Sequence, residues 1–465
     1  MFRRIDGTAL VTTFSSTDPP RKIQGSSRKC LWTVLLVFLV VCSSGCRHAQ
    51  PEPVTLTFMD PEWSHDQSRR SLLSEANLRE FEQQFGVKVK HLPAPETSQQ
   101  QLAVMQDLLR KEGPIDVYGV DVVWSGLLDD GLLDLKPFFA SELSADDPDV
   151  VAGYTVKGKV VAVPYHTNVS VLMYRTDLLK KYGYHAPPQT WSELEQMALR
   201  IQRGERAAGD DNFWGFVWPG AADEGLTCVA LEWQMSEGGG RIIEGNETIS
   251  VNNEHAIKAW QRAAHWIGWI SPSSTTSYKE WDAINAFENS GEAAFRRAWT
   301  SDYFLTNEVE TPTYGKTGFT SVPGGSMPGV GTLGGFGLGV ARTSKHPTEA
   351  VALLRFLLHK EAELEQSRAA AQLPVTTQFY RLPTILEAYS RSIPAGQPRG
   401  SGVVARPSTL TGPNYEKVSR AYADAVHSVL TGEKKASAAA AALENELVQI
   451  TGFAKGQPEP APPPK

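Results

Sequence analysis

The stretch GYTVKGKVVAVPYHTNVSVLMYRTDLL, residues 153–179, sets the expected architecture of the chain. Two short β-branched runs, 154–156 and 159–163, flank Lys157-Gly158, which predicts a tight hairpin. Pro164 is expected to end the second strand, a polar cluster follows at 165–168, and a new strand runs over 169–174. Polar side chains between two buried strands suit a cleft, although an ordinary polar turn explains them equally well.

Strand and helix patterns alternate before this stretch. Runs of strand type lie at 54–59, 87–91 and 115–120, and helical periodicity covers 67–85 and 99–111. This order indicates an α/β fold with a mostly parallel sheet and helices on both faces. Ligands of such sheets bind beyond the carboxyl ends of the strands. Glu62-Trp63 follows the first strand, and Asp121 follows the third.

The chain beyond residue 190 continues with both kinds of element. Helices are expected at 191–206, 224–237, 254–267 and 279–289, and strands at 213–218 and 293–299. A glycine-rich region covers 315–339, and a largely helical region runs from Pro347 to about residue 453. Residues 456–465 are rich in proline, which predicts a disordered tail.

Size and charge narrow the class of protein. A chain of 465 residues is too long for one core, so we expect two domains or two lobes. The net charge is -7, and the first 45 residues are basic, so the remainder is strongly acidic. The sequence has no basic footprint for nucleic acid, and we expect no nucleic-acid partner.

The N-terminal segment reads as an export signal. Arg28-Lys29 precedes an apolar run at 30–42, which is too short to span a bilayer. The following Ser-Ser-Gly-Cys, residues 43–46, resembles a bacterial lipobox, although Ser43 stands where leucine is usual. We therefore expect a signal peptide at 1–45, a lipidated Cys46 and a linker at 46–53. Cys228 would then be the one cysteine left in the body of the protein, and its apolar surroundings predict a buried residue.

Motif searches give no enzyme class. GVGTLG at 329–334 satisfies the dinucleotide-binding pattern, but no strand precedes it and no helix follows it. The sequence has no HExxH motif and no Cys-x-x-Cys pair, and its ten histidines show no ligand spacing. We expect no cofactor and no metal. A glycosidase pair of carboxylates is not excluded by the sequence.

Aromatic and polar side chains at strand ends suit a sugar, whose C–H faces stack on rings while its hydroxyls need donors and acceptors. Trp63, Trp233, Trp299 and Phe336 are the candidate rings, with core packing as the alternative for each. Asp121 and Glu232 are candidate acceptors, with a helix cap or a solvated face as the alternative.

Residues 54–453 resemble the sugar-type solute-binding lipoproteins of ATP-binding-cassette importers, most closely the trehalose/maltose-binding proteins. The similarity is densest at 163–191, 204–240, 293–299 and 331–356. The resemblance implies a two-lobed fold of the type II periplasmic-binding-protein kind, with hinge crossovers and a ligand cleft between the lobes. The crossovers would lie near 165–168, 299 and 336–342.

By this resemblance, residues 54–165 with 300–335 form the N-terminal lobe, and residues 166–299 with 336–453 form the C-terminal lobe. Residues 454–465 form the tail. The protein would be a monomeric binding component and not an enzyme. It would capture a di- or oligosaccharide at the outer side of a bacterial cell membrane, held there by its lipid, and deliver it to a permease with its ATPase. A secreted carbohydrate-active enzyme and a lipid-anchored adhesion or scaffold protein are the alternatives.

The resemblance also assigns residues. It implies that Asp121 accepts from sugar hydroxyls, that Trp299 stacks, that Arg406 donates and that Glu62 lies close to a binding carboxylate. His166, Asn168, Ser301 and Phe336 stand where the relatives have Tyr, Asp, Tyr and Trp, so the preferred sugar could differ. The full predicted set is Glu62, Trp63, Asp121, His166, Asn168, Glu232, Trp233, Trp299, Ser301, Phe336 and Arg406.

Overall fold

The computed structural model describes residues 53–60, 75–95, 98–111, 114–302, 311–359, 373–382 and 402–459. Pro53–Lys465 forms one compact unit, distinct from Met1–Glu52. The expected signal peptide, Cys46, Glu62 and Trp63 lie outside the described residues. Among the described helices, none is long and apolar enough to cross a membrane.

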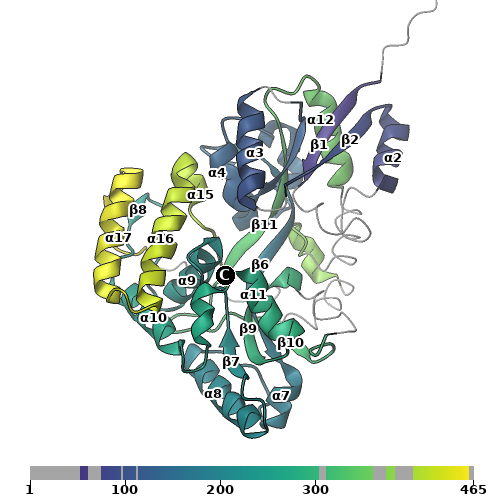
Figure 1. The fold of residues 1–465 in the computed structure, drawn as a ribbon. Coiled ribbons are helices and arrows are strands. Elements are labelled where there is room, and N and C mark those ends of the chain that lie inside the picture. Colours follow the sequence, from purple (N-terminus) through teal and green to yellow (C-terminus); the bar gives the residue numbers. More distant parts are fainter. Residues whose placement is uncertain are drawn as a thin grey trace, which may run out of the picture. The chain divides into compact units, whose positions relative to one another are not determined.

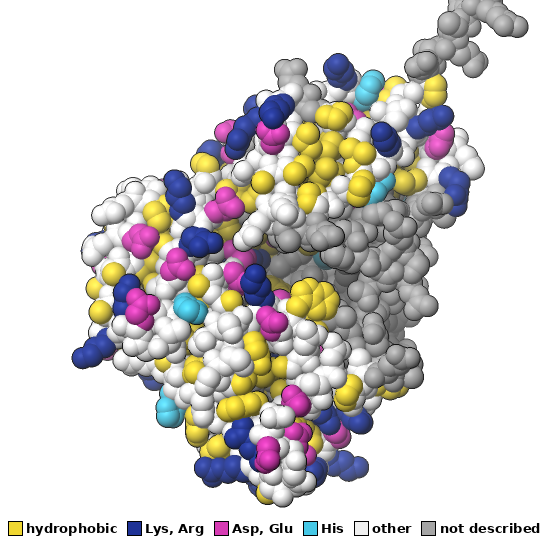
Figure 2. Space-filling model, in the orientation of Figure 1, with side chains coloured by type: hydrophobic (Ala, Val, Ile, Leu, Met, Phe, Trp, Pro, Cys, Tyr) yellow, Lys and Arg dark blue, Asp and Glu magenta, His cyan; other side chains and the backbone are white. Residues whose placement is uncertain are grey.

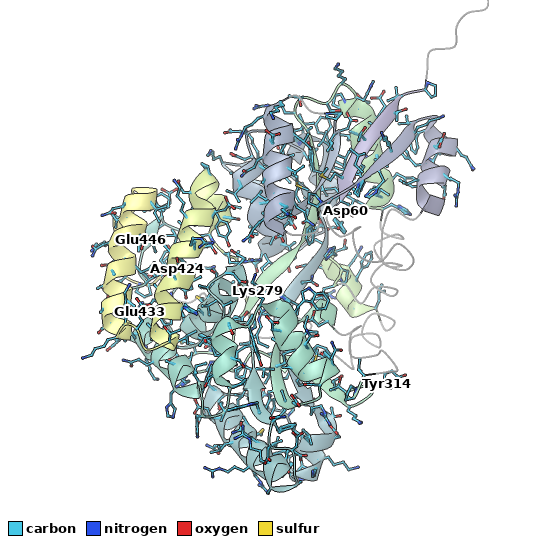
Figure 3. The ribbon with its side chains drawn as sticks, in the orientation of Figure 1. Asp60, Lys279, Tyr314, Asp424, Glu433 and Glu446 are labelled. Carbon is cyan, nitrogen blue, oxygen red and sulfur yellow. The ribbon has the colours of Figure 1, made fainter. Side chains whose placement is uncertain are left out.

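The first part of the unit is the predicted strand-helix alternation. Its elements are β1 (Thr55–Asp60), α2 (Glu75–Phe85), β2 (Lys88–Pro93), α3 (Ser98–Arg110) and β3 (Val117–Asp121). Strand β1 pairs in parallel with both β2 and β3, which confirms the parallel arrangement expected for these three strands. The sheet as a whole is mixed, because residues 336–340 pair antiparallel with β3. Asp60 and Asp121 are the last residues of β1 and β3, and Asp60 is labelled in Figure 3. The carboxyl ends of these two strands therefore meet at one edge of the sheet.

The next segment holds the hairpin and the longest strand. Short helices α4 (Ser125–Leu128), α5 (Lys136–Leu143) and α6 (Pro148–Gly153) lead to β4 (Thr155–Val156), β5 (Lys159–Val160) and β6 (Val163–Arg175). Strands β4 and β5 pair antiparallel across Lys157-Gly158, whose φ angles are 50° and 82°, which confirms the hairpin. The predicted break at Pro164 is wrong. Pro164 faces a register shift between Phe336 and Gly337, and an irregular pairing of this kind tolerates the missing N–H.

Strands β6 and β11 (Gly331–Val340) connect the sheet of the first part to that of the second (Figure 1). The order of the sheet is β2-β1-β3-β11-β6-β9-β7, with β10 (Thr317–Ser321) beside β6 and β12 (Val403–Val404) beside β11. β9 spans Ala293–Trp299 and β7 spans Trp214–Val217. The first half of β6 pairs with β11, and its second half pairs with β9 and β10. One uninterrupted strand thus carries the chain from one core to the other.

Helices complete the second part. They are α7 (Thr176–Lys181), α8 (Trp191–Ala207), α9 (Glu224–Ser236), α10 (Glu254–Trp266), α11 (Glu280–Ile284), α16 (Tyr415–Leu430) and α17 (Ala436–Thr451). Helix α15 (Ser408–Thr411) instead lies against α4 of the first part, where the Ser408 hydroxyl donates to the Val122 carbonyl at 3.3 Å. Thr190 and Glu193 form a capping box that starts α8 at the predicted position. Asp424, Glu433 and Glu446 are exposed on and beside α16 and α17, so the acidic excess there is solvated (Figure 3).

Two elements fall in the other core from the one predicted. Helix α12 (Pro347–Leu357) packs Leu353 and Leu354 with Phe58 of β1, whereas the resemblance predicts residues 336–453 in the C-terminal lobe. Strand β10 pairs with the second half of β6 and packs Phe319 among its side chains, whereas the resemblance predicts residues 300–335 in the N-terminal lobe. These long-range pairings place α12 with the first core and β10 with the second.

The predicted disordered tail is wrong over its first residues. β13 (Ala454–Lys455) pairs in parallel with β8 (Thr248–Ile249). Beyond it, the Glu459 carboxylate accepts hydrogen bonds from the backbone N–H groups of Gly245 and Asn246 at 3.3 and 3.1 Å. Backbone pairing and a charge-assisted contact hold residues 454–459 in place. Residues 460–465 lie outside the described part of the chain.

Candidate functional site

Strand register brings five of the predicted site residues to one face of the sheet. Phe336 of β11 lies opposite His166 of β6 and opposite Asp121 of β3. Gly334 lies opposite Asn168, and Ser170 lies opposite Trp299 of β9. Directly paired residues share a face, and every second residue along a strand returns to it. Asp121, His166, Asn168, Trp299 and Phe336 therefore lie on the same face, and we call these five residues the crossover cluster.

Two rings of the crossover cluster, Trp299 and Phe336, are partly exposed to solvent. Trp299, Phe336, Asn168 and Asp121 are half-buried, whereas His166 is 1% exposed. The His166 and Phe336 ring centroids are 5.8 Å apart. A Cβ at Gly334 would come within 3.0 Å of the Trp299 indole, so this glycine gives the ring its space. Figure 2 shows the surface hollowed across the middle of the described residues, with acidic and basic side chains along the rim.

The polar members of the cluster also hold the backbone. Asp121 caps the 3-10 turn Val122–Trp124, because its Oδ1 accepts from the Val123 N–H at 3.0 Å. The alternative expectation of a cap is therefore confirmed for Asp121, and its half-buried carboxylate still belongs to the cluster face. The Thr300 hydroxyl lies 3.5 Å from Asn168 Oδ1 and accepts from the Val169 N–H at 3.2 Å. These hydrogen bonds hold Asp121 and Asn168 in place on the sheet.

Arg406 is tied to the strand that carries Phe336. Its Nη2 donates to the Leu333 carbonyl at 3.0 Å, and its Nη1 pairs with Glu224 at 2.7 Å. Glu224 also accepts from the hydroxyls of Tyr415 and Ser419 at 2.5 and 2.6 Å. Arg406 is 8% exposed, and its Nε has no hydrogen-bond partner among the described residues. This Nε is itself buried, so the role of Arg406 as a donor to ligand stays a prediction.

Glu232 and Trp233, predicted as a pair facing the ligand, point in different directions from α9. Glu232 is 1% exposed and pairs with Arg297 at 2.7 Å. Trp233 is 2% exposed and packs edge to face with Trp218 and Trp266 at centroid distances of 4.9 and 5.6 Å. Neither side chain lies at an open surface. We therefore correct the prediction and remove both from the candidate ligand contacts, because the helix buries one against the sheet and the other in its own core.

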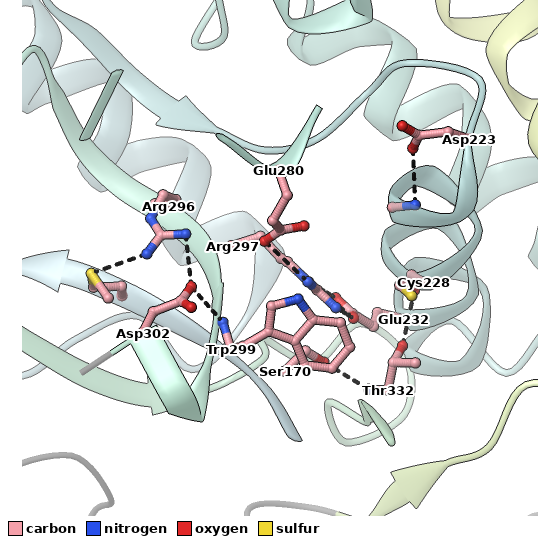
Figure 4. A network of polar contacts seen from close by, with 12 residues as sticks. Ser170, Asp223, Cys228, Glu232, Glu280, Arg296, Arg297, Trp299, Asp302 and Thr332 are labelled. Atoms are coloured by element: carbon pink, nitrogen blue, oxygen red, sulfur yellow. Dashed lines mark hydrogen bonds and ion pairs between the residues drawn. The ribbon is translucent and has the colours of Figure 1, made fainter. Parts of the chain in front are cut away.

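Arg297 is a residue that the sequence reasoning missed. It lies two residues before Trp299 on β9, and its guanidinium carbon is 4.0 Å from the Trp299 ring centre. Its Nη1 is 3.7 Å from Glu280 Oε1, and its other edge meets Glu232 (Figure 4). Burial raises the pKa of Glu280 to about 7. Two adjacent arginines in an apolar strand, Arg296-Arg297, are the signal that could have drawn attention to this position.

Arg296 points to the other face of β9. It pairs with Glu288 at 3.1 Å and with Asp302 at 3.0 Å, and it is fully buried. Asp302 also accepts from the Trp299 backbone N–H at 3.0 Å, so it fixes the end of the strand (Figure 4). Ser301, between these groups, is half-buried and directly precedes Asp302. The cluster is thus anchored from both faces of the sheet.

Metal ligands and the cysteine thiol are the remaining reactive groups to place among the described residues. These residues contain no group of three or more His, Cys, Asp or Glu side chains arranged to hold a metal ion. Cys228 is 2% exposed, as predicted, and burial raises the pKa of its thiol to about 12. Its backbone carbonyl accepts from the Thr332 hydroxyl at 3.0 Å, which joins α9 to β11.

The sheet order and the two crossing strands define the type II periplasmic-binding-protein fold, which confirms the expected fold class. Residues 76–390 match the family described as bacterial extracellular solute-binding protein. The chain belongs to this family. The expected resemblance to sugar-type solute-binding proteins of ATP-binding-cassette importers is confirmed with it.

Individual relatives agree with this family. The chain is 41% identical to a probable ABC transporter-binding protein of Deinococcus radiodurans over 374 residues, which are 79% of this chain and 87% of the relative. A structure of maltose-bound MalE3 of T. maritima superimposes with a TM-score of 0.71 at 30% identity, covering 85% of this chain and 100% of that one. The GacH receptor of Streptomyces glaucescens shares the fold at a TM-score of 0.70 and 21% identity, with 87% of this chain and 100% of that one covered.

Proposed function

We propose that the protein is the substrate-binding component of a sugar importer and captures a di- or oligosaccharide of the maltose or trehalose type on the crossover cluster. The observation that carries the proposal is the register, which puts two half-buried rings and two half-buried polar side chains on one sheet face. Rings offer faces for the C–H groups of a sugar, and the carboxylate and amide oxygens accept from its hydroxyls. The 30% identity to a maltose-bound structure supports the same ligand class.

Isothermal titration tests this function. The chain from residue 47 onward is titrated with maltose, maltotriose, trehalose and mannitol, and the mixtures are then analysed by chromatography. Saturable binding of at least one saccharide with no change in the sugar is expected. Hydrolysis of any saccharide would favour the carbohydrate-active enzyme instead. Lack of binding to the whole panel would contradict the ligand class.

Capture includes closure of the groove between the two cores. Strands β6 and β11 are the covalent connections at the cluster, so a ligand that touches both sides stabilises a closed form by its differential affinity. Small-angle scattering should show a smaller radius of gyration at saturation with the saccharide that binds most tightly. An unchanged radius would indicate a preformed, rigid site.

The proposal includes anchoring at the outer side of the cell membrane, where the protein delivers sugar to a permease and its ATPase. Gly45-Cys46 follows a short apolar run, which supports lipidation at Cys46. Each buried acyl CH₂ contributes about 0.8 kcal/mol to membrane binding, so Cys46→Ala should release the processed protein. Retention of processed Cys46→Ala on membranes would contradict the anchor.

A further inference from the structure

We propose that Arg297 is a positioning residue for Trp299, holding the indole where a sugar can stack on it, and that Glu232 holds Arg297 in turn. The inference rests on the proposed function, because it adds a supporting residue to the same site. The predicted set includes Glu232 as a ligand contact, and here the residue acts on the ligand only through two others. Figure 4 shows the Arg297 guanidinium beside the Trp299 ring and in contact with the Glu232 carboxylate.

The first step is the contact between cation and ring. Arg297 and Trp299 alternate with Ala298 on β9, so both project from the cluster face. The guanidinium carbon lies 4.0 Å from the ring centre, well within the range of a cation–π interaction. The far edge of the indole reaches Gly334 of β11. The ring is therefore bounded by a cation on its own strand and by bare backbone across the sheet.

The second step is the immobilisation of the cation. Arg297 Nη2 and Nε donate to Glu232 Oε1 at 2.7 and 3.2 Å, and the two side chains are 3% and 1% exposed. A two-bond contact to a carboxylate fixes the plane of a guanidinium, which a lysine cannot reproduce. Burial alone would lower the pKa of Arg297, but Glu232 and Glu280 raise it, so the cation is permanent. Helix α9 is itself fixed to β11 through Cys228 and Thr332.

The third step concerns the unused edge of the guanidinium. Arg297 Nη1 and Glu280 Oε1 are 3.7 Å apart, and neither atom has a hydrogen-bond partner among the described residues. A buried ion pair is often replaceable by apolar residues without loss of stability. An incompletely satisfied pair is thus a weak stabilising device. The contact of Arg297 with the Trp299 ring therefore explains this arginine better than a contribution to stability does.

Arg175 provides a matched control. It is 8% exposed, lies on β6, and forks onto Asp177 through Nε and Nη2 at 2.8 and 2.7 Å. Arg175 is paired with Thr317 of β10. It lies five residues further along β6 than Ser170, the residue that is paired with Trp299. Arg175→Lys therefore removes a two-bond contact of another buried arginine, onto a carboxylate that is 38% exposed, at a distance from the cluster.

The experiment is a double-mutant cycle. Arg297→Lys, the double variant Arg297→Met with Glu232→Met, and Arg175→Lys are each made with Trp299 and with Trp299→Leu. Titration with whichever of maltose, maltotriose, trehalose and mannitol binds most tightly gives Kd, with excess ligand used for weak variants, and melting gives Tm. The double variant removes the Arg297–Glu232 pair together, and Glu280, whose pKa burial already raises, can take up a proton when its cation is lost, so the fold stays testable.

With Trp299 present, both Arg297 variants should weaken binding by about fivefold to tenfold, while Arg175→Lys lowers Tm and leaves Kd unchanged. With Trp299→Leu, the Arg297 variants should have no further effect on Kd, because the ring through which they act is gone. Unchanged Kd in both Arg297 variants would overturn the inference. So would an equal loss with and without Trp299, which would make Arg297 a direct ligand contact. If Trp299→Leu alone leaves Kd unchanged, the proposed site itself is wrong.

Discussion

Trp299 and Trp233 belong to two regions that use the same side chain for opposite purposes. The crossover cluster keeps Trp299 half-buried on a sheet face, with a cation on one side and glycine backbone at its edge. The tryptophan core behind α9, made of Trp218, Trp233 and Trp266, packs its rings edge to face at 4.9 and 5.6 Å. In the sequence both regions look alike, as tryptophan beside charged residues. The difference lies in what covers each ring.

The two tryptophan regions should contribute differently to sugar affinity and to folding stability. A ring that is already fully packed contributes to folding and has no face left for a ligand. A ring that is supported from below and open above contributes less to folding and can still bury area on binding. Substitutions in the two regions should therefore change different measurements.

The largest effect should come from the tryptophan core. Trp233→Ala removes a side chain that is 2% exposed and leaves a cavity, so we expect a loss of about 3–5 kcal/mol in the free energy of unfolding. Denaturant unfolding measures this loss. Sugar affinity of the folded fraction should stay the same. A weaker Kd at unchanged stability would move Trp233 into the site.

Trp299→Ala should produce the reverse pattern. Loss of the stacking face should weaken sugar binding by about 2 kcal/mol or more, which is more than about tenfold in Kd. Because the ring is half-buried, the change in Tm should be smaller than for Trp233→Ala. Titration and thermal melts of the two variants in parallel show whether the regions are distinct. A large drop in Tm with unchanged Kd would make Trp299 a core residue.

Asp121→Asn should have a smaller and more selective effect. Asparagine can keep the cap to Val123, because it is as good an N-cap residue as aspartate, so Tm should change little. The lost charge should weaken binding by about 1 kcal/mol if the carboxylate accepts from sugar hydroxyls. Titration of this variant beside the unsubstituted chain checks the value. An unchanged Kd would restrict Asp121 to its capping role.

A different kind of effect should appear in the pH dependence of stability, at Glu280 beside Arg297. Burial raises the pKa of Glu280 from 4.5 to about 7 in the folded protein. The folded state then holds the proton more tightly than the unfolded state, so this residue makes stability fall as pH rises from about 4.5 to about 7. Glu280→Gln should flatten the fall. Melting curves across this range test it, and an unaltered profile would contradict the raised pKa.

Much of the fold could be predicted from local patterns. The hairpin at Lys157-Gly158, the parallel strands β1 to β3 and the start of α8 follow from turn chemistry, periodicity and capping. The continuity of β6 through Pro164 could not be predicted, because it depends on the register shift in β11 opposite it. The positions of α12 and β10 likewise depend on pairings between distant segments.

The candidate site could be predicted where strands carry it. Alternation along β6, β9 and β11 brings Asn168, Trp299 and Phe336 to one face once the pairing is known. The helix α9 gave no comparable guide, because ten of its residues are buried and its pattern does not distinguish a sheet-facing side from a core-facing side. The sequence therefore predicts Glu232 and Trp233 together as ligand contacts and gives no prediction for Arg297.

Fluorine NMR tests the difference between the two tryptophan regions most directly. The chain is labelled with 5-fluorotryptophan, and the signals of Trp299 and Trp233 are assigned by their loss in Trp299→Phe and Trp233→Phe. On titration with the saccharide that binds most tightly, the Trp299 signal should shift in proportion to saturation while the Trp233 signal stays in place. A Trp299 signal that does not move at saturation, or a shift confined to Trp233, would contradict the account.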